Sequence, residues 1–473
     1  MTIKPPRRFN RELFIDLITI LITLAIFLLI KSEGFFYRFG DGNAYFYMAQ
    51  QVLKGIFPYR DFLIADPPLL IFLLAGIKLV IGSNILLFQV VPIFLETITA
   101  LILYLEVKKK LPNYAKFFPA LYLFSFLILS TTDYLTGLHF ITFFIALGYF
   151  FRHKPYLSGF FWGLATLIKL YVIPGFIGWL VWLKISKQPE RLKKTVLAYV
   201  GTGVVFMLPF LIMAPKAVVD QIIIHQFNRP AGLNKLSVFR FFILHDFLLL
   251  CVSTVTFFLN KKLKFFLPIF AWLIFFLIFK DLYYLYLGVL GYWLMLTVFQ
   301  LLTHFKKPTQ HSWLAHNHQQ LSLMVVITLL LSQVIGVFIY YQSTQKQGIF
   351  FQIEEVVKFV NTLPEKPLYG SHEVAPIIAL KTGRKLFNDY ADTNMQLFGS
   401  GVIDREKISQ EAVEEGVHLL VKVTNIPENL DLDQGYSGYF EPEIFEQYCE
   451  RLTIIDGAKL ELFTDIGVYH CKK

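Results

Sequence analysis

The sequence predicts a mainly α-helical, polytopic membrane protein that ends in a small α/β domain. Of its 473 residues, 55% are hydrophobic and only 16% are charged, whereas a soluble chain carries about 25% charged residues. Apolar runs of roughly 17–25 residues, the length that crosses a bilayer, recur through residues 1–344. Residues 345–473 are soluble in composition and alternate strand and helix patterns, which favours an α/β domain.

Basic residues predict how the chain is oriented in the membrane. The net charge of +10 comes from short clusters between the apolar runs, at 4–11, 108–110, 184–194, 261–264 and 304–307. Such clusters mark cytoplasmic loops, so we exclude nucleic acid as a partner and expect a cytoplasmic N-terminus. The first apolar run, Leu13–Ile30, lacks a small-residue cleavage site and is expected to be an uncleaved anchor.

The short apolar run Pro68–Gly82 leaves two topologies open. If it crosses the membrane, the cluster at 108–110 falls outside, against the charge rule. If it lies flat on the outer surface, the cluster stays inside. We adopt the flat helix, so residues 31–84 form a first outer loop with interfacial helices and the C-terminal domain is extracytoplasmic. The resulting spans, about eleven, are 13–30, 85–107, 116–130, 138–151, 156–168, 172–182, 195–213, 239–259, 265–279, 286–302 and 321–341.

Periodicity also predicts the elements of the C-terminal domain. Helices are expected at 349–362, 373–381, 404–415 and 441–452, and strands near 367–371, 417–423, 452–455, 459–463 and 468–471. The domain also holds Cys449 and Cys471. We expect two unpaired thiols, because neither spacing nor sequence fixes their distance. A disulfide is the alternative if the domain lies outside the cell.

The first outer loop carries a dense group of candidate functional residues. Asp41 lies just beyond the first span, where a carboxylate can act as a general base towards a hydroxyl; a helix cap is the alternative. The run Tyr59-Arg60-Asp61 places a cation beside an acid. A guanidinium suits a phosphate, although an internal ion pair would also explain this run. Asp66 is expected only to start the flat helix with the two prolines that follow it.

Other polar residues fall on the same predicted outer face, which suggests one site there. Asp133 lies in a very short loop, where helix capping is the alternative to a functional role. Lys169 interrupts an apolar stretch and either snorkels to the interface or binds an anionic headgroup. His225 and Arg229 lie in the predicted outer loop 214–238. Lys280 precedes an aspartate between two spans. It is expected either to form a structural ion pair or to contact a phosphate.

Four runs of the sequence resemble the GT-C-type membrane glycosyltransferases, among them protein O-mannosyltransferases, the aminoarabinose transferase of lipid A and bacterial polyprenyl-phosphate-sugar transferases. The run GDGNAYFYMAQQVLKGIFPYRDFLIADPPL looks like their first outer loop. STTDYLTGLHFITFFIALGYFF is similar to their second, where an acid often sits. GFFWGLATLIKLYVIP resembles the helix pair that carries a lysine. KDLYYLYLGVLGYW resembles the late segment that approaches the donor, which adds Tyr284 to the candidates.

The resemblance implies an inverting transfer of a sugar from a polyprenyl-phosphate-linked donor to a hydroxyl of a glycan, lipid or protein acceptor on the outer face of the membrane. Asp41 would deprotonate that hydroxyl, and fixed cations would stabilise the leaving phosphate. The catalytic candidates are Asp41, Asp133 and Asp61, and the donor-binding candidates are Arg60, Lys169, Arg229, Lys280, Tyr59, His225 and Tyr284. No cofactor is implied. A divalent metal is optional on the family pattern, and no ligand cluster in the sequence demands one.

Two other functions compete with glycosyl transfer. A transporter or flippase of lipid-linked sugars would carry charges near mid-bilayer and interrupted helices in paired positions, and the sequence shows no such repeat. A ligase that moves a whole glycan would keep its essential residues in a large late outer loop, whereas the loop 214–238 is modest. Glycosyl transfer is therefore the preferred prediction.

Overall fold

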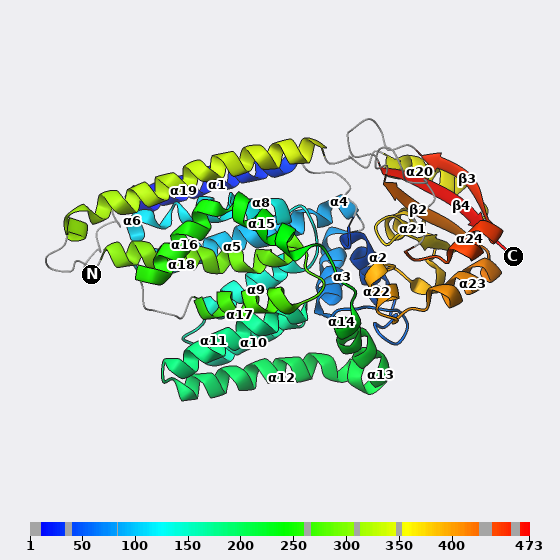
Figure 1. Ribbon diagram of the computed structural model, residues 1–473, viewed down its shortest axis with the longest axis horizontal. Helices are drawn as coiled ribbons and strands as arrows, with labels where there is room; N and C mark the ends of the chain where they lie inside the picture. The colour runs from blue at the N-terminus through cyan, green and yellow to red at the C-terminus, as the bar shows by residue number, and fades with distance from the viewer. Residues whose placement is uncertain are drawn as a thin grey trace, which may run out of the picture.

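A computed structural model describes residues 11–33, 40–82, 84–259, 266–306, 313–346, 352–424, 438–455 and 464–473. The molecule is elongated, with a bundle of helices at one end and the C-terminal domain at the other (Figure 1). Between them lie α2 (Gly42–Leu53) and α3 (Leu69–Ile81), which belong to the predicted first outer loop, residues 31–84, and pack against each other. The structure is mainly helical with a small C-terminal sheet region, as the predicted fold class requires.

The bundle is built from apolar helices, as expected for an integral membrane protein. Within the described residues, five stretches are long and apolar enough to cross a membrane: Arg11–Ser32, Ile85–Lys108, Pro189–Met213, Tyr284–Phe305 and Gln319–Gln342. Shorter apolar helices span Leu69–Ile81, Leu138–Phe150, Leu170–Ile185 and Phe266–Ile278. The total of about eleven spans stays a prediction.

The helices of the bundle and its loops follow the chain in order. They are α1 (Arg11–Ser32), α4 (Ile85–Phe88), α5 (Val90–Lys108), α6 (Pro112–Ala115), α7 (Phe118–Leu123), α8 (Phe126–Thr131), α9 (Leu138–Phe150), α10 (Pro155–Thr166), η1 (Leu170–Val172), α11 (Ile173–Ile185), α12 (Pro189–Met213), α13 (Pro215–Val218), η2 (Val219–Ile224), α14 (His225–Asn228), α15 (Lys235–His245), α16 (Phe247–Leu259), α17 (Phe266–Ile278), η4 (Tyr284–Val289), α18 (Leu290–Phe305) and α19 (Trp313–Lys346).

Two predicted spans are wrong as single helices. The run 239–259 is divided at Asp246 into α15 and α16, which bend by 88°. The buried Asp246 carboxylate accepts a hydrogen bond of 3.0 Å from the backbone N–H of Leu127, so it satisfies an otherwise unpaired donor at the start of α8. The run 116–130 is divided into α7 and α8, because Ser125 takes a non-helical backbone conformation between them.

The C-terminal domain contains a four-stranded mixed sheet in the order β1-β2-β4-β3. β1 is parallel to β2, and β4 is antiparallel to both β2 and β3. Four helices of the domain lie around these strands, in agreement with the prediction (Figure 1). The elements are α20 (Gln352–Thr362), β1 (Leu368–Gly370), α21 (Ala375–Thr382), η5 (Phe387–Asp389), α22 (Met395–Gly399), α23 (Arg405–Glu415), β2 (Val417–Thr424), α24 (Pro442–Tyr448), β3 (Cys449–Ile455) and β4 (Thr464–Cys471).

Two expectations for this domain are wrong. The helix predicted at 441–452 ends at Tyr448, and Cys449 already starts β3. The register of β3 on β4 places Cys449 directly opposite Cys471, with their Cα atoms 4.0 Å apart, and the two form a disulfide. The strand predicted at 459–463 lies outside the described residues.

Candidate functional site

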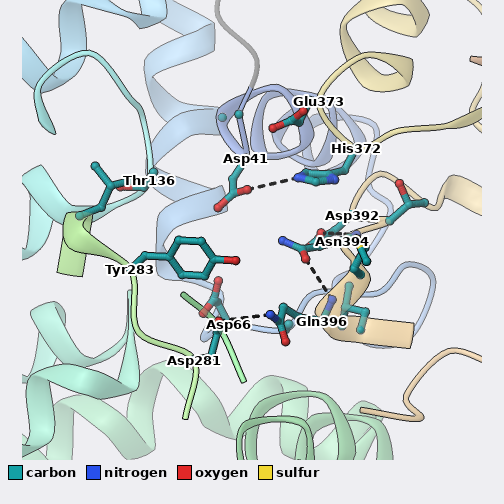
Figure 2. A pocket seen from close by; sticks show the side chains of 18 of the residues that line it. Asp41, Asp66, Thr136, Asp281, Tyr283, His372, Glu373, Asp392, Asn394 and Gln396 are labelled. Atoms are coloured by element: carbon teal, nitrogen blue, oxygen red, sulfur yellow. Dashed lines mark hydrogen bonds and ion pairs between the residues drawn. The ribbon is translucent and has the colours of Figure 1, made fainter. Parts of the chain in front are cut away.

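A cavity of about 1450 Å³ lies where the bundle, the first outer loop and the C-terminal domain meet. Asp41 and Asp66 come from the first outer loop, whereas Asp281 and Tyr283 come from the segment between α17 and η4. His372 and the acidic residues near it come from the C-terminal domain. Figure 2 shows these side chains arranged around one space. Most of the polar residues predicted to converge on one site therefore line one cavity, although Asp61 and Lys280 do not.

Asp41 directly precedes α2, yet its side chain makes no capping hydrogen bond within the described structure. Its carboxylate instead faces His372, with 3.5 Å between Oδ1 and Nε2, and 43% of the side chain is accessible. Burial acts to raise the pKa of Asp41, but the hydrogen bond and charge of His372, with the charges of Lys169 and Arg229, outweigh it and lower the pKa. The result is an ionised, reachable carboxylate, as a general base requires.

Two predicted cations face the same cavity, each beside a carboxylate. Lys169 forms an ion pair with Asp66, and its ammonium donates a hydrogen bond of 3.0 Å to the hydroxyl of Tyr45 on α2. Arg229 lies 3.0 Å from the Oδ2 atom of Asp281. Fixed cations of this kind can stabilise negative charge that develops on a bound phosphate. The expectation that Asp66 only starts α3 is wrong, because its carboxylate is the partner of Lys169.

His225 holds the guanidinium of Arg229. Arg229 Nε donates to His225 Nε2 across 3.1 Å, so Nδ1 carries the imidazole proton and donates it to Ser400 Oγ, 2.7 Å away. Burial and the neighbouring Arg229 charge lower the pKa of His225 to about 4. His225 is therefore neutral near pH 7 and orients a cavity cation from the α14 side while contacting the C-terminal domain.

Asp133 lines the cavity but is committed to other partners. It forms an ion pair with Lys31 at the end of α1, and the hydroxyl of Tyr340 on α19 donates to it across 2.8 Å. Only 5% of its side chain is accessible. Its helix-capping alternative is not what the structure shows either, because Gly137 occupies the N-cap of α9. Asp133 ties together the ends of two helices.

The described lining of the cavity does not include Tyr59, Arg60, Asp61 or Lys280. Arg60 pairs with Asp61 at 2.7 Å on the exposed surface, which is the internal ion pair considered as the alternative. Tyr59 and Arg60 line a second cavity of about 700 Å³. Lys280 is exposed. Among the other donor-binding candidates, Tyr284 does line the main cavity.

Several lining residues were missed by sequence reasoning. A signal was present for Asp66, because this acid lies on the predicted outer face together with the lysine that interrupts an apolar stretch, and the two could pair. For His372, Glu373 and Asp392 no local signal existed, because their position depends on how the C-terminal domain docks on α2. In the part of the chain that the structure describes, no three His, Cys, Asp or Glu side chains are grouped to hold a metal ion. Metal dependence stays a prediction.

The bundle, the first outer loop and the docked α/β domain together form an ArnT-like fold. Two solved structures of ArnT from Cupriavidus metallidurans share it, one bound to undecaprenyl phosphate and one in the apo state. Each has a TM-score of 0.59 and 12% sequence identity, covering 95% of this chain and 97% of that chain. No family model and no curated protein matches the sequence. At this identity the likeness establishes the fold, which confirms the predicted fold class.

Proposed function

We propose that this protein is an inverting glycosyltransferase that moves a sugar from a polyprenyl-phosphate-linked donor to an acceptor hydroxyl on the outer face of the membrane. One observation carries the proposal: an ionised carboxylate, Asp41, shares a cavity with Lys169 and Arg229. Such a reaction needs a base to take the proton of the acceptor hydroxyl and cations to stabilise the negative charge on the leaving phosphate, and this cavity contains both. The undecaprenyl phosphate bound to ArnT, which has the same fold, supports the class of donor.

The chemistry is a single displacement. Asp41 takes the proton of the acceptor hydroxyl while that oxygen forms a bond to the anomeric carbon. The bond between the anomeric carbon and the phosphate oxygen breaks, and the lipid phosphate leaves with the electron pair. Lys169 and Arg229 stabilise the charge on this leaving group. Attack from the face opposite the phosphate inverts the anomeric centre.

The disulfide supports the outer-face location of the cavity. Cys449 and Cys471 are bonded in the same domain that supplies His372. Disulfides persist in oxidising compartments and are rare in the cytosol. The C-terminal domain is therefore placed outside the cell in this proposal, with the cavity beside it. Gel-shift labelling of thiols in intact cells, before and after reduction, tests this location.

The catalytic role of Asp41 is tested by substitution. Asp41→Asn keeps the shape of the side chain but removes the base, so transfer should fall by about 10²- to 10⁴-fold. Asp61→Asn is the matched control, because Asp61 lies on the same loop and outside the described cavity lining, and it should retain wild-type transfer. The assay follows radiolabelled sugar from a panel of undecaprenyl-phosphate sugars into envelope lipid and glycan. Full activity of Asp41→Asn would overturn the role of the base.

The donor site is tested with undecaprenyl phosphate alone. Arg229→Gln should weaken its binding by about tenfold or more, because charge-assisted hydrogen bonds to phosphate are among the stronger contacts. Arg60→Gln removes an exposed guanidinium that is not among the described residues lining the main cavity, and it should leave binding unchanged. Equal loss in both variants would contradict the donor site. Movement of labelled lipid-linked sugar across vesicles without transfer would instead favour a flippase.

A further inference from the structure

We propose that the C-terminal domain completes the site, and that its His372 is a positioning residue that holds the Asp41 carboxylate in its productive orientation. This inference rests on the proposed function, since it concerns the residue proposed as the base. It assigns to the domain a part in the reaction itself, beyond covering the cavity.

The first observation is the contact between the two side chains. His372 Nε2 lies 3.5 Å from Asp41 Oδ1, across the boundary between the first outer loop and the C-terminal domain. The imidazole is the more enclosed partner, with 17% of its side chain accessible against 43% for Asp41. Figure 2 shows His372 reaching Asp41 from the domain side, which leaves the rest of the carboxylate open to the cavity. The imidazole therefore orients the carboxylate without blocking it.

The second observation is a clamp that fixes α2 to the C-terminal domain. Near the start of α2, Asn43 donates a hydrogen bond of 2.6 Å from Nδ2 to the backbone carbonyl of Glu373, next to His372. One turn later, the hydroxyl of Tyr47 donates to Asp389 across 2.7 Å. The same hydroxyl accepts the backbone N–H of Leu386 at 3.0 Å. Both Asn43 and Tyr47 are buried.

This clamp determines where Asp41 lies. Gln51, a further turn along α2, also donates to Asp389. Since Asp41 immediately precedes this helix, the domain that holds the helix also sets the position of the carboxylate. A base must stand within hydrogen-bond reach of the proton that it takes. The same short segment, 371–375, therefore provides both a backbone anchor for α2 and the imidazole that faces Asp41.

The charges around His372 favour its cationic form. It faces Asp41 at the start of α2, Glu373 in its own segment and Asp392 in the segment before α22. Burial acts to lower the pKa of His372, but its hydrogen bond to Asp41 and the charges of Glu373, Asp41 and Asp392 raise it to about 9. The contact with Asp41 is thus an ion pair near pH 7. Losing the charge of His372 should raise the pKa of Asp41, because burial raises this pKa and fewer positive charges would then lower it.

The kinetic test separates this role from a merely structural contact. In His372→Ala, kcat should fall about 10- to 100-fold, as for other residues that orient a reacting group. The KM for the undecaprenyl-phosphate sugar should stay within about threefold, because phosphate contacts are untouched. The acid limb of the pH–rate profile should move to higher pH. His372→Gln retains a donor without the charge, so it should recover part of kcat but keep the shifted acid limb.

The control is Lys407→Ala, which removes an exposed charge of the same domain whose nearest carboxylate, Glu411, is 3.9 Å away. This variant should match the wild type in kcat and in pH profile. Thermal unfolding of each variant in detergent checks that the chain is folded. A folded His372→Ala with wild-type kcat and acid limb would overturn the inference. So would an acid limb that shifts equally in Lys407→Ala.

A measurement without catalysis separates this inference from the proposed function. NMR of the full-length protein with ¹⁵N-labelled histidine gives the titration of His372, assigned by its loss in His372→Gln. The midpoint should lie near pH 9 in the wild type and fall towards the ordinary value in Asp41→Asn. Titration near the ordinary value in both proteins would overturn the pair even if transfer activity is real. Conversely, a confirmed pair with a fully active Asp41→Asn would leave the contact standing but refute the catalytic base, and with it the positioning role of His372.

Discussion

His225 shows how a single buried residue makes the site sensitive to acid. Its Nε2 atom accepts a hydrogen bond from Arg229, and its Nδ1 atom serves Ser400 in the C-terminal domain. The imidazole is fully buried, so a second proton would place a cation against the guanidinium of Arg229. Protonation would also remove the acceptor that orients a cation of the cavity. The neutral form is therefore part of the architecture of the site.

We expect the folded state to lose stability as the pH falls from about 6.5 towards 4. Over this window the unfolded chain binds a proton that the folded protein excludes, because the pKa of His225 is depressed to about 4 on folding. The loss is on the order of 3 kcal/mol at most. His225→Gln cannot titrate, so its stability should depend less on pH. Thermal unfolding in detergent between pH 7 and 4.5 measures both; identical slopes would contradict the prediction.

At the scale of elements, α10 and α12 pack through glycines spaced four residues apart. A Cβ atom added to Gly159 would lie 2.1 Å from the backbone oxygen of Thr195, and one added to Gly163 would lie 2.8 Å from the Cβ of Thr202. Small residues at this spacing let membrane helices approach closely. The two glycines of α10 let α12 pack against the rest of the bundle. The opposite face of α12 is largely exposed apolar surface.

Gly159→Ala should therefore destabilise the protein by about 1–3 kcal/mol, because the new methyl group meets backbone that cannot move aside. Gly203→Ala is the matched control on α12, where an added Cβ has no described neighbour within 4 Å. It should be neutral or stabilise the helix by about 0.5–1 kcal/mol. Thermal unfolding of the two variants in the same detergent makes the comparison. A Gly159→Ala variant as stable as Gly203→Ala would show that the helices can separate freely.

At the scale of the whole molecule, the two parts are joined at the cavity and not only through the chain. α2 is held by Asp389 and by the backbone of Glu373, while Gln396 donates a hydrogen bond of 3.2 Å to Asp281. The domain itself is closed by the disulfide between β3 and β4. The domain holds α2, and α2 holds Asp41. Destabilising the domain should therefore also make the position of the Asp41 carboxylate less fixed.

Replacing Cys449 and Cys471 together by serine should cost the domain about 2–4 kcal/mol. Transfer activity at elevated temperature should fall with it, since α2 is anchored on that domain. Reduction of the wild type should reproduce both losses, whereas the reductant should have no effect on the double serine variant. Thermal unfolding and transfer assays with and without reductant test this. Unchanged activity after the domain has melted would show that the bundle positions Asp41 alone.

Local patterns predicted much of this molecule correctly. The apolar runs identified the helical bundle, and the composition change located the α/β domain. Asp404 caps α23 by accepting the N–H of Lys407, and Gly383 ends α21 in the left-handed region, close to the predicted start and end of these helices. Of the proposed site residues, Asp41, Lys169 and Arg229 all line the cavity. These signals depend on residues close together in the chain.

Other features were decided only by contacts between distant segments. The break at Asp246 depends on the backbone of Leu127, and the role of Asp66 depends on Lys169. Arg60 and Asp61 form a self-contained surface pair, which sequence reasoning could not distinguish from a phosphate site.

By itself, the sequence determined that a helical membrane bundle carries an acid just after its first helix and a soluble α/β domain at its end. Hydropathy and periodicity reveal these features because both are patterns of residues close together in the chain. Only the tertiary structure decided that His372 faces Asp41 and that Asp133 is held by Lys31. The physical reason is that both contacts depend on how distant segments pack together. The paired residues are about a hundred positions apart in one case and several hundred in the other, and such a pair leaves no periodic pattern in the sequence.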